Sequence, residues 1–167
     1  MIVIRIIHIL CAIFWTGATL YLAAFVIPAV KAMGPDGGKF MAQLTRTNKL
    51  PVVMLTISTL AVIAGLIMMY DISGGFRLLW FGTPHGIVVS CGAASAIIAY
   101  ITGFIVNIPT VKKIAALSKT IAESGVPPAI QQMEQLQNLR RTLFAATYFV
   151  AGLLLLAALF MSMARYF

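Results

Sequence analysis

Four long apolar stretches constrain this chain most: residues 2–30, 51–70, 84–108 and 143–163. A helix needs about 20 apolar residues to cross the ~30 Å hydrocarbon core of a bilayer. Only helices and closed barrels satisfy every backbone hydrogen bond in lipid, and these runs are continuous rather than alternating, which indicates helices. Because 61% of the residues are hydrophobic and only 10% are charged, we expect an integral membrane protein.

The predicted fold is all-α: one transmembrane domain over residues 1–167, built as a four-helix bundle. The helices are expected at about residues 2–30, 51–70, 84–123 and 127–165. The third and fourth continue beyond the lipid and form a helical hairpin, with Pro127-Pro128 opening the return helix.

The segments between the helices carry clear local signals. The glycine-rich cluster at residues 34–38 predicts a turn, and residues 39–48 a short amphipathic segment on the membrane surface. Thr83 and Pro84 suit the N-cap and the first residue of the third helix.

The net charge of +8 is distributed unevenly. Nine of the 12 Lys and Arg residues lie between the first and second helices or between the third and fourth: Lys31, Lys39, Arg46, Lys49, Lys112, Lys113, Lys119, Arg140 and Arg141. By the positive-inside rule these segments are cytoplasmic, so the hairpin is cytoplasmic and both termini are periplasmic in a cell inner membrane. The charge is thus an orientation signal, and we expect no nucleic-acid partner.

Both histidines, His8 and His85, lie near the starts of helices that begin on the same side of the membrane. An imidazole in a membrane is costly without a partner, so two at one depth indicate a shared ligand. We expect them to be the axial ligands of a haem b iron, which takes neutral imidazoles from both faces of the macrocycle.

Helical periodicity places each histidine on an inward stripe. The stripe of His8 includes Trp15, and the stripe of His85 consists of small residues such as Gly92. Small residues permit close helix packing or leave room for a flat macrocycle. Trp15 and Gly92 are therefore candidate haem contacts.

Haem propionates need basic partners near the surface, and the periplasmic side has few charges. Arg5, one turn before His8, and Arg77 in the loop after the second helix are the candidates. The alternative for Arg5 is snorkelling to lipid headgroups.

Two alternatives remain open. Methionines end the second and fourth helices on the side of the histidines, and thioether plus imidazole is a soft ligand set suited to Cu(I), so a copper-binding or copper-permeation protein is one alternative. Its further ligands would be Met68, Met69, Met161 and Met163. The other alternative is a structural membrane subunit without a cofactor.

The membrane core contains no acidic residue, which argues against carboxylate-coupled transport and two-carboxylate hydrolysis. For the haem hypothesis we expect an electron-transfer subunit or a haem-dependent membrane oxidoreductase, a cytochrome b in type. A quinol or periplasmic redox carrier would be its partner, within a homo-oligomer or larger membrane complex.

The run from His8 to Leu22, in which Trp15-Thr16-Gly17 begins seven residues after the histidine, resembles the first helix of a group of small membrane proteins. The group includes copper-resistance D-type proteins, HemJ-type protoporphyrinogen oxidases and uncharacterised proteins of about this length. Residues 107–113 and the hairpin up to Arg140-Arg141 are similar to the third inter-helix loop of the uncharacterised members.

The resemblance to the HemJ-type enzymes implies that His8 is a haem ligand. Those enzymes also use a lysine near the start of the third helix, whereas this chain has Pro84-His85-Gly86 there. The departure argues against protoporphyrinogen oxidation and leaves His85 as a replacement ligand. The resemblance to the copper-type proteins implies a periplasmic metal role.

Overall fold

The computed structural model describes residues 1–125 and 127–167, with residue 35 through its backbone alone, and this part of the chain is helical without a strand. In chain order the elements are α1 (Ile2–Tyr21), η1 (Leu22–Val26), α2 (Ile27–Ala32), α3 (Pro35–Ala42), η2 (Gln43–Thr47), α4 (Leu50–Ile72), α5 (Leu78–Phe81), α6 (Pro84–Thr102), η3 (Gly103–Asn107), α7 (Ile108–Glu123), α8 (Ile130–Met163) and η4 (Ala164–Tyr166).

Four continuous helical segments are long and apolar enough to cross a membrane: Ile2–Ala32, Leu50–Ile72, Pro84–Ser124 and Ile130–Tyr166. Many of their large apolar side chains, such as Leu10 and Phe25, are exposed on the outside of the bundle, where lipid would surround them. The prediction of an all-α, multi-pass membrane protein is confirmed.

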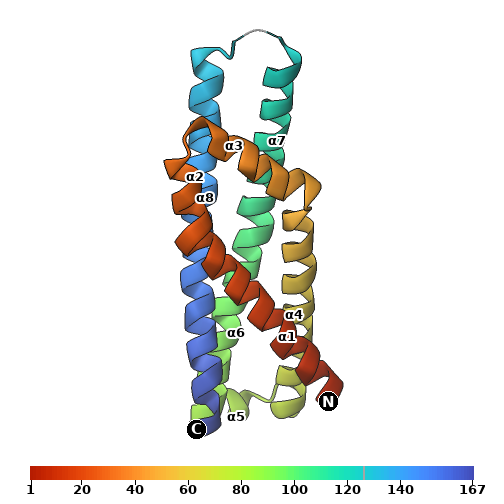
Figure 1. Cartoon of the computed structure of the whole chain (residues 1–167). Coiled ribbons are helices and arrows are strands. Elements are labelled where there is room, and N and C mark those ends of the chain that lie inside the picture. Colours follow the sequence, from red (N-terminus) through yellow and green to blue (C-terminus); the bar gives the residue numbers. More distant parts are fainter. Residues whose placement is uncertain (126) are drawn as a thin grey trace.

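The bundle has two distinct ends (Figure 1). Both chain termini and α5 lie at one end, which we call the terminal end, while α3 and the α7–α8 hairpin lie at the other, the hairpin end. α1 packs chiefly against α4, and α6 chiefly against α8. α1 runs diagonally, so that it starts beside α4 and reaches α8 at η1. The bundle therefore consists of two helix pairs, α1/α4 and α6/α8.

The centre of the bundle is packed with Trp15, Ala61, Ala99, Val150 and Leu154, all at most 6% exposed. The alanines let the backbones approach closely, as is common between membrane helices. Trp15 lies on the predicted stripe of His8 and Ala99 on that of His85, so both stripes face inward as the periodicity indicated.

Two π-helical turns carry the membrane helices past prolines. The Ile27 N–H donates to the carbonyl of Leu22, five residues back, and the Ile108 N–H donates to that of Gly103. Each turn comes just before a proline, at positions 28 and 109, which supplies no N–H and crowds the carbonyl four residues back. Widening the helix accommodates the proline without ending the helix.

The glycine-rich cluster at residues 34–38 is a turn only at Gly34, whereas the sequence predicted a turn throughout. Only Gly34 has a positive φ, of 57°, and α3 begins directly after it. Gly37 lies against the backbone carbonyl of Val30, and Gly38 lies under the guanidinium of Arg140. Gly37 allows α3 to approach α2 closely, because a Cβ there would collide with backbone, whereas at Gly38 the flexible Arg140 side chain could move aside.

The start of α6 agrees with the sequence prediction, and the start of α8 differs from it. The Thr83 hydroxyl accepts a hydrogen bond from the Gly86 N–H at 3.0 Å, so the predicted N-cap of α6 is confirmed. α8 begins at Ile130 rather than at Pro127. A residue before proline is disfavoured in the helical region, which keeps Pro127 outside the helix, and the Gln132 side chain caps the Ala129 N–H at 3.0 Å.

Candidate functional site

His8 is half-buried between α1 and α4, where it meets the middle of α4. Its Nδ1 lies 2.8 Å from the carbonyl oxygen of Ala61, and its ring lies against Gly65 one turn further along α4. A Cβ atom added at Gly65 would stand 2.8 Å from the His8 Cε1 atom, well inside contact distance. Gly65 therefore provides the space in which the imidazole sits.

His85 is held in a similar way by the other helix pair. It lies in the first turn of α6, and its Nδ1 is 2.8 Å from the carbonyl oxygen of Ala164 at the end of α8. The Trp80 ring of α5 meets it edge-on, with centroids 6.1 Å apart. The short α5 helix and the end of α8 thus fix the ring.

The two hydrogen bonds define which ring nitrogen carries a proton. A carbonyl oxygen can only accept, so Nδ1 is the donor in both histidines. In the neutral imidazole the Nε2 atom then keeps its lone pair. Histidines that ligate metals commonly donate their other N–H to a backbone carbonyl, which orients the ring. Nε2 is therefore the nitrogen through which either side chain could ligate.

The hydrogen bonds attach the two imidazoles to different helix pairs. His8 bonds to α4 within the α1/α4 pair, and His85 bonds to the last residues of the α6/α8 pair. α1 and α6, which carry the two histidines near their starts, both begin at the terminal end (Figure 1). The His8 acceptor lies midway along α4 and the His85 acceptor just after α8, and no contact among the described residues joins the rings, so their shared ligation of one iron stays a prediction.

The other predicted haem contacts lie in different surroundings. Arg5 and Arg77 are exposed, and neither has a carboxylate within ion-pair distance among the described residues. Trp15 is buried in the central packing, 6% exposed. Gly92 is buried against α8, where an added Cβ would lie 3.1 Å from Met161 Cε and 3.2 Å from Phe160 Cβ. Helix packing therefore occupies the space beside Gly92.

The methionines of the copper alternative lie in two separate places. Met68 and Met69 lie three and four residues after Gly65, one turn beyond the His8 ring on α4. Met161 packs on Gly92, about two helical turns from His85, and Met163 is at the end of α8. Within the described residues no group of three or more His, Cys, Asp and Glu side chains is placed to hold a metal.

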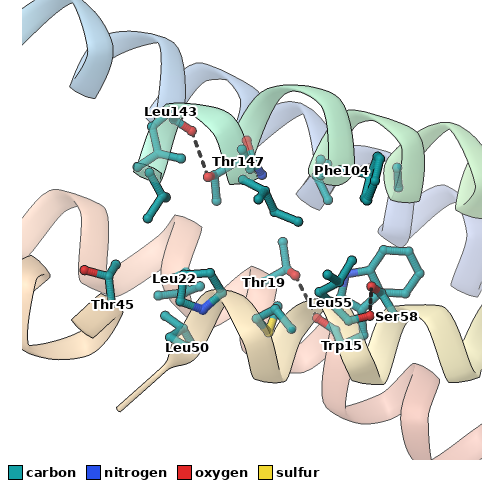
Figure 2. Close-up of a pocket in the computed structure, with 18 of the residues that line it drawn as sticks. Trp15, Thr19, Leu22, Thr45, Leu50, Leu55, Ser58, Phe104, Leu143 and Thr147 are labelled. Carbon is teal, nitrogen blue, oxygen red and sulfur yellow. Dashed lines mark hydrogen bonds between the residues drawn. The ribbon is translucent and has the colours of Figure 1, made fainter. Parts of the chain in front are cut away.

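A cavity of about 130 Å³ lies inside the bundle, and we call it the interior cavity. It was not predicted from the sequence. Figure 2 shows Trp15, Thr19 and Leu55 on one side of it and Phe104 and Thr147 on the other. All three π-helical segments contribute to its wall. In the sequence, the prolines that follow two of these segments were the only local sign of the π-helical turns.

The lining of the interior cavity is mostly apolar, with a few polar groups. The hydroxyls of Thr19, Ser58 and Thr147 donate to carbonyls of their own helices at 2.8–3.0 Å (Figure 2). Asn107 differs, because its buried Oδ1 atom has no hydrogen-bond partner among the described residues. An unpaired buried acceptor of this kind is costly.

No family model, curated protein or solved structure matches this chain. The resemblance to HemJ-type and copper-resistance D-type proteins stays a prediction.

Proposed function

We propose that this chain is a membrane haem b protein, in which His8 and His85 are the axial ligands near the terminal end. The observation that supports it is the shared anchoring of the two imidazoles. Each Nδ1 donates to a backbone carbonyl of another helix at 2.8 Å, which leaves the Nε2 lone pair as the one that could bind a ligand. Two neutral imidazoles are a donor set that suits haem iron.

Haem b, when bound, supplies one-electron redox chemistry. The residues of the chain orient the ligands and bind the anionic propionates, for which the exposed Arg5 and Arg77 are the available cations. Because His8 and His85 belong to different helix pairs, one haem held by both would join the two pairs. Haem binding should therefore stabilise the bundle in addition to producing the absorption bands of haem.

The charge distribution supports an orientation for this proposal. The hairpin end carries most of the basic residues and is cytoplasmic, while the terminal end is periplasmic in an inner membrane. A single haem near the periplasmic surface cannot carry electrons across ~30 Å of lipid. Electron exchange is therefore with a quinol or a periplasmic carrier in the outer leaflet, in a homo-oligomer or as a subunit of a larger membrane complex.

The absorption spectrum of detergent-purified protein, expressed with adequate haem, tests the proposal. We expect a Soret band in the wild type that weakens or shifts in both His8→Ala and His85→Ala. Gly17→Ala is the matched control, because nothing lies within 4 Å of an added Cβ there. A wild type without porphyrin, or two histidine variants with the wild-type spectrum, would contradict the proposal.

A copper site is the second candidate, favoured by the position of Met68 and Met69 one turn from the His8 ring. Metal analysis of the same preparation distinguishes the copper site from the haem site. Retained copper without porphyrin, lost in a Met68→Leu/Met69→Leu double variant, would replace the haem proposal.

A further inference from the structure

A second, larger hollow lies beyond the interior cavity at the hairpin end. This basic hollow has a volume of about 640 Å³, and its lining includes Lys31, Arg140, Arg141, Phe144 and Tyr148. The Lys31 Nζ atom stands 5.6 Å from the ring centroids of both Phe144 and Tyr148. The hollow thus combines cationic and aromatic groups.

A narrow hollow of about 70 Å³ lies between the basic hollow and the interior cavity. It shares Met41, Thr45 and Leu143 with the interior cavity, and Arg140 with the basic hollow. Phe144 borders all three. The three spaces are therefore neighbours separated by shared side chains, and we call them a row, apolar in the bundle and basic at the hairpin end.

The cations of this row are not neutralised by carboxylates. The ion pairs within residues 1–125 and 127–167 are Lys39–Asp36 and Lys119–Glu123, so Lys31, Arg140 and Arg141 have no acidic partner there. The Arg140 guanidinium is held over Gly38. Three cations gathered around one hollow favour an anionic ligand.

The depth of these cations corresponds to lipid headgroups. Lys31 is the penultimate residue of the first apolar segment, and Arg140 and Arg141 come just before the apolar part of α8 that starts at Leu143. Cations at this position lie at the membrane–water boundary. The interior cavity extends from there into the hydrocarbon region, as far as Trp15.

The volume of the interior cavity suits an apolar group. An empty cavity of ~150 Å³ can hold a benzene-sized molecule, so 130 Å³ accommodates part of an acyl chain.

We infer that this row of spaces binds one anionic phospholipid. Its phosphate lies among Lys31, Arg140 and Arg141, and part of an acyl chain enters the interior cavity. The basic hollow lies at the hairpin end, and the site does not depend on haem.

The test measures the thermal stability of the delipidated full-length protein in mild detergent. Phosphatidylglycerol, phosphatidylcholine and inorganic phosphate are titrated separately. We expect a saturable rise in Tm with phosphatidylglycerol alone. An equal rise with phosphatidylcholine would overturn the requirement for negative charge, and an equal rise with inorganic phosphate would reduce the site to an anion site without a lipid chain.

Two variants locate the binding. Lys31→Gln/Arg140→Gln should weaken phosphatidylglycerol binding about 25-fold, roughly fivefold for each cation removed, whereas Arg165→Gln at the terminal end should leave it unchanged. Wild-type affinity in the double variant would refute the inference.

Gly103→Leu tests the apolar part, because Gly103 lines the interior cavity and has nothing within 4 Å of an added Cβ. It should reduce lipid binding, whereas Gly152→Leu, with the same open surroundings on the exposed side of α8, should not. Equal binding by the two leucine variants would exclude the acyl chain from the cavity. If Gly103→Leu does not fold, the Lys31→Gln/Arg140→Gln variant still tests whether the lipid binds at this site.

Discussion

Replacing Gly65 with alanine tests whether α4 determines the position of the His8 imidazole. The added methyl group would lie 2.8 Å from His8 Cε1, about 0.7 Å inside the ~3.5 Å of a normal carbon–carbon contact. The ring is rigid and is tied to the carbonyl of Ala61, so it must rotate away and lose that hydrogen bond.

The magnitude follows from three contributions. Overpacking at a close contact costs about 1–3 kcal/mol, and the lost hydrogen bond costs about 1 kcal/mol. Replacing a helical glycine with alanine returns about 1 kcal/mol. The Gly65→Ala protein should therefore be less stable by roughly 1–3 kcal/mol, which corresponds to a fall in Tm of about 2–12 °C.

Two measurements check this result. Thermal unfolding compares Gly65→Ala with Gly17→Ala, which should be as stable as the wild type or slightly more stable, because its Cβ meets nothing within 4 Å. Nitrogen NMR of protein labelled at its two histidines then follows the ring nitrogens, assigned with His85→Ala. If Gly65→Ala equals Gly17→Ala in stability and the His8 nitrogens do not shift, α4 does not position the ring.

Three further predictions concern other parts of the molecule. Thr83→Ala removes the N-cap of α6 and should lower stability by about 1 kcal/mol, whereas Thr83→Ser should retain it; equal unfolding temperatures for the two would contradict the cap. Gly37→Ala should destabilise the protein strongly, because its Cβ would collide with the backbone of Val30; an unchanged Tm would show that α3 does not pack closely there. Asn107→Leu removes an unpaired buried acceptor and should raise the Tm of the lipid-free protein; a lower Tm would mean that the amide has a partner.

The membrane-spanning helices were predictable because their signals are local. Continuous apolar length alone indicated the four spans, and Thr83 followed by Pro84 indicated where α6 begins. The inward stripes that contain Trp15 and Ala99 follow from the period of the helix. Each of these features depends on residues within one segment.

The roles of the glycines were predicted wrongly or overlooked because the contacts that require glycine come from other segments of the chain. The cluster at residues 34–38 reads locally as a turn, yet Gly37 is needed for contact with Val30. The need for glycine at position 65 has no local signal, because it comes from contact with His8, more than 50 residues earlier in the chain. A sequence shows that a glycine is present, but only the packing shows which neighbour requires it.

The histidine region was predicted in its position but not in its attachment. Helix direction predicted His8 and His85 near the starts of helices that begin at one end, whereas their acceptors, Ala61 midway along α4 and Ala164 after α8, depend on which helices pair. An apolar sequence does not reveal this pairing, because apolar helices can pack in several orders. The basic hollow was missed for the same reason, since its cations come from separate segments.

The electron paramagnetic resonance spectrum of the oxidised, haem-loaded protein tests the central claim most directly. Ligation of one iron by His8 and His85 predicts a low-spin ferric signal that becomes high-spin when either histidine is replaced by alanine. A high-spin signal in the wild type, or a low-spin signal that survives both replacements, would contradict the claim that these two imidazoles share one iron.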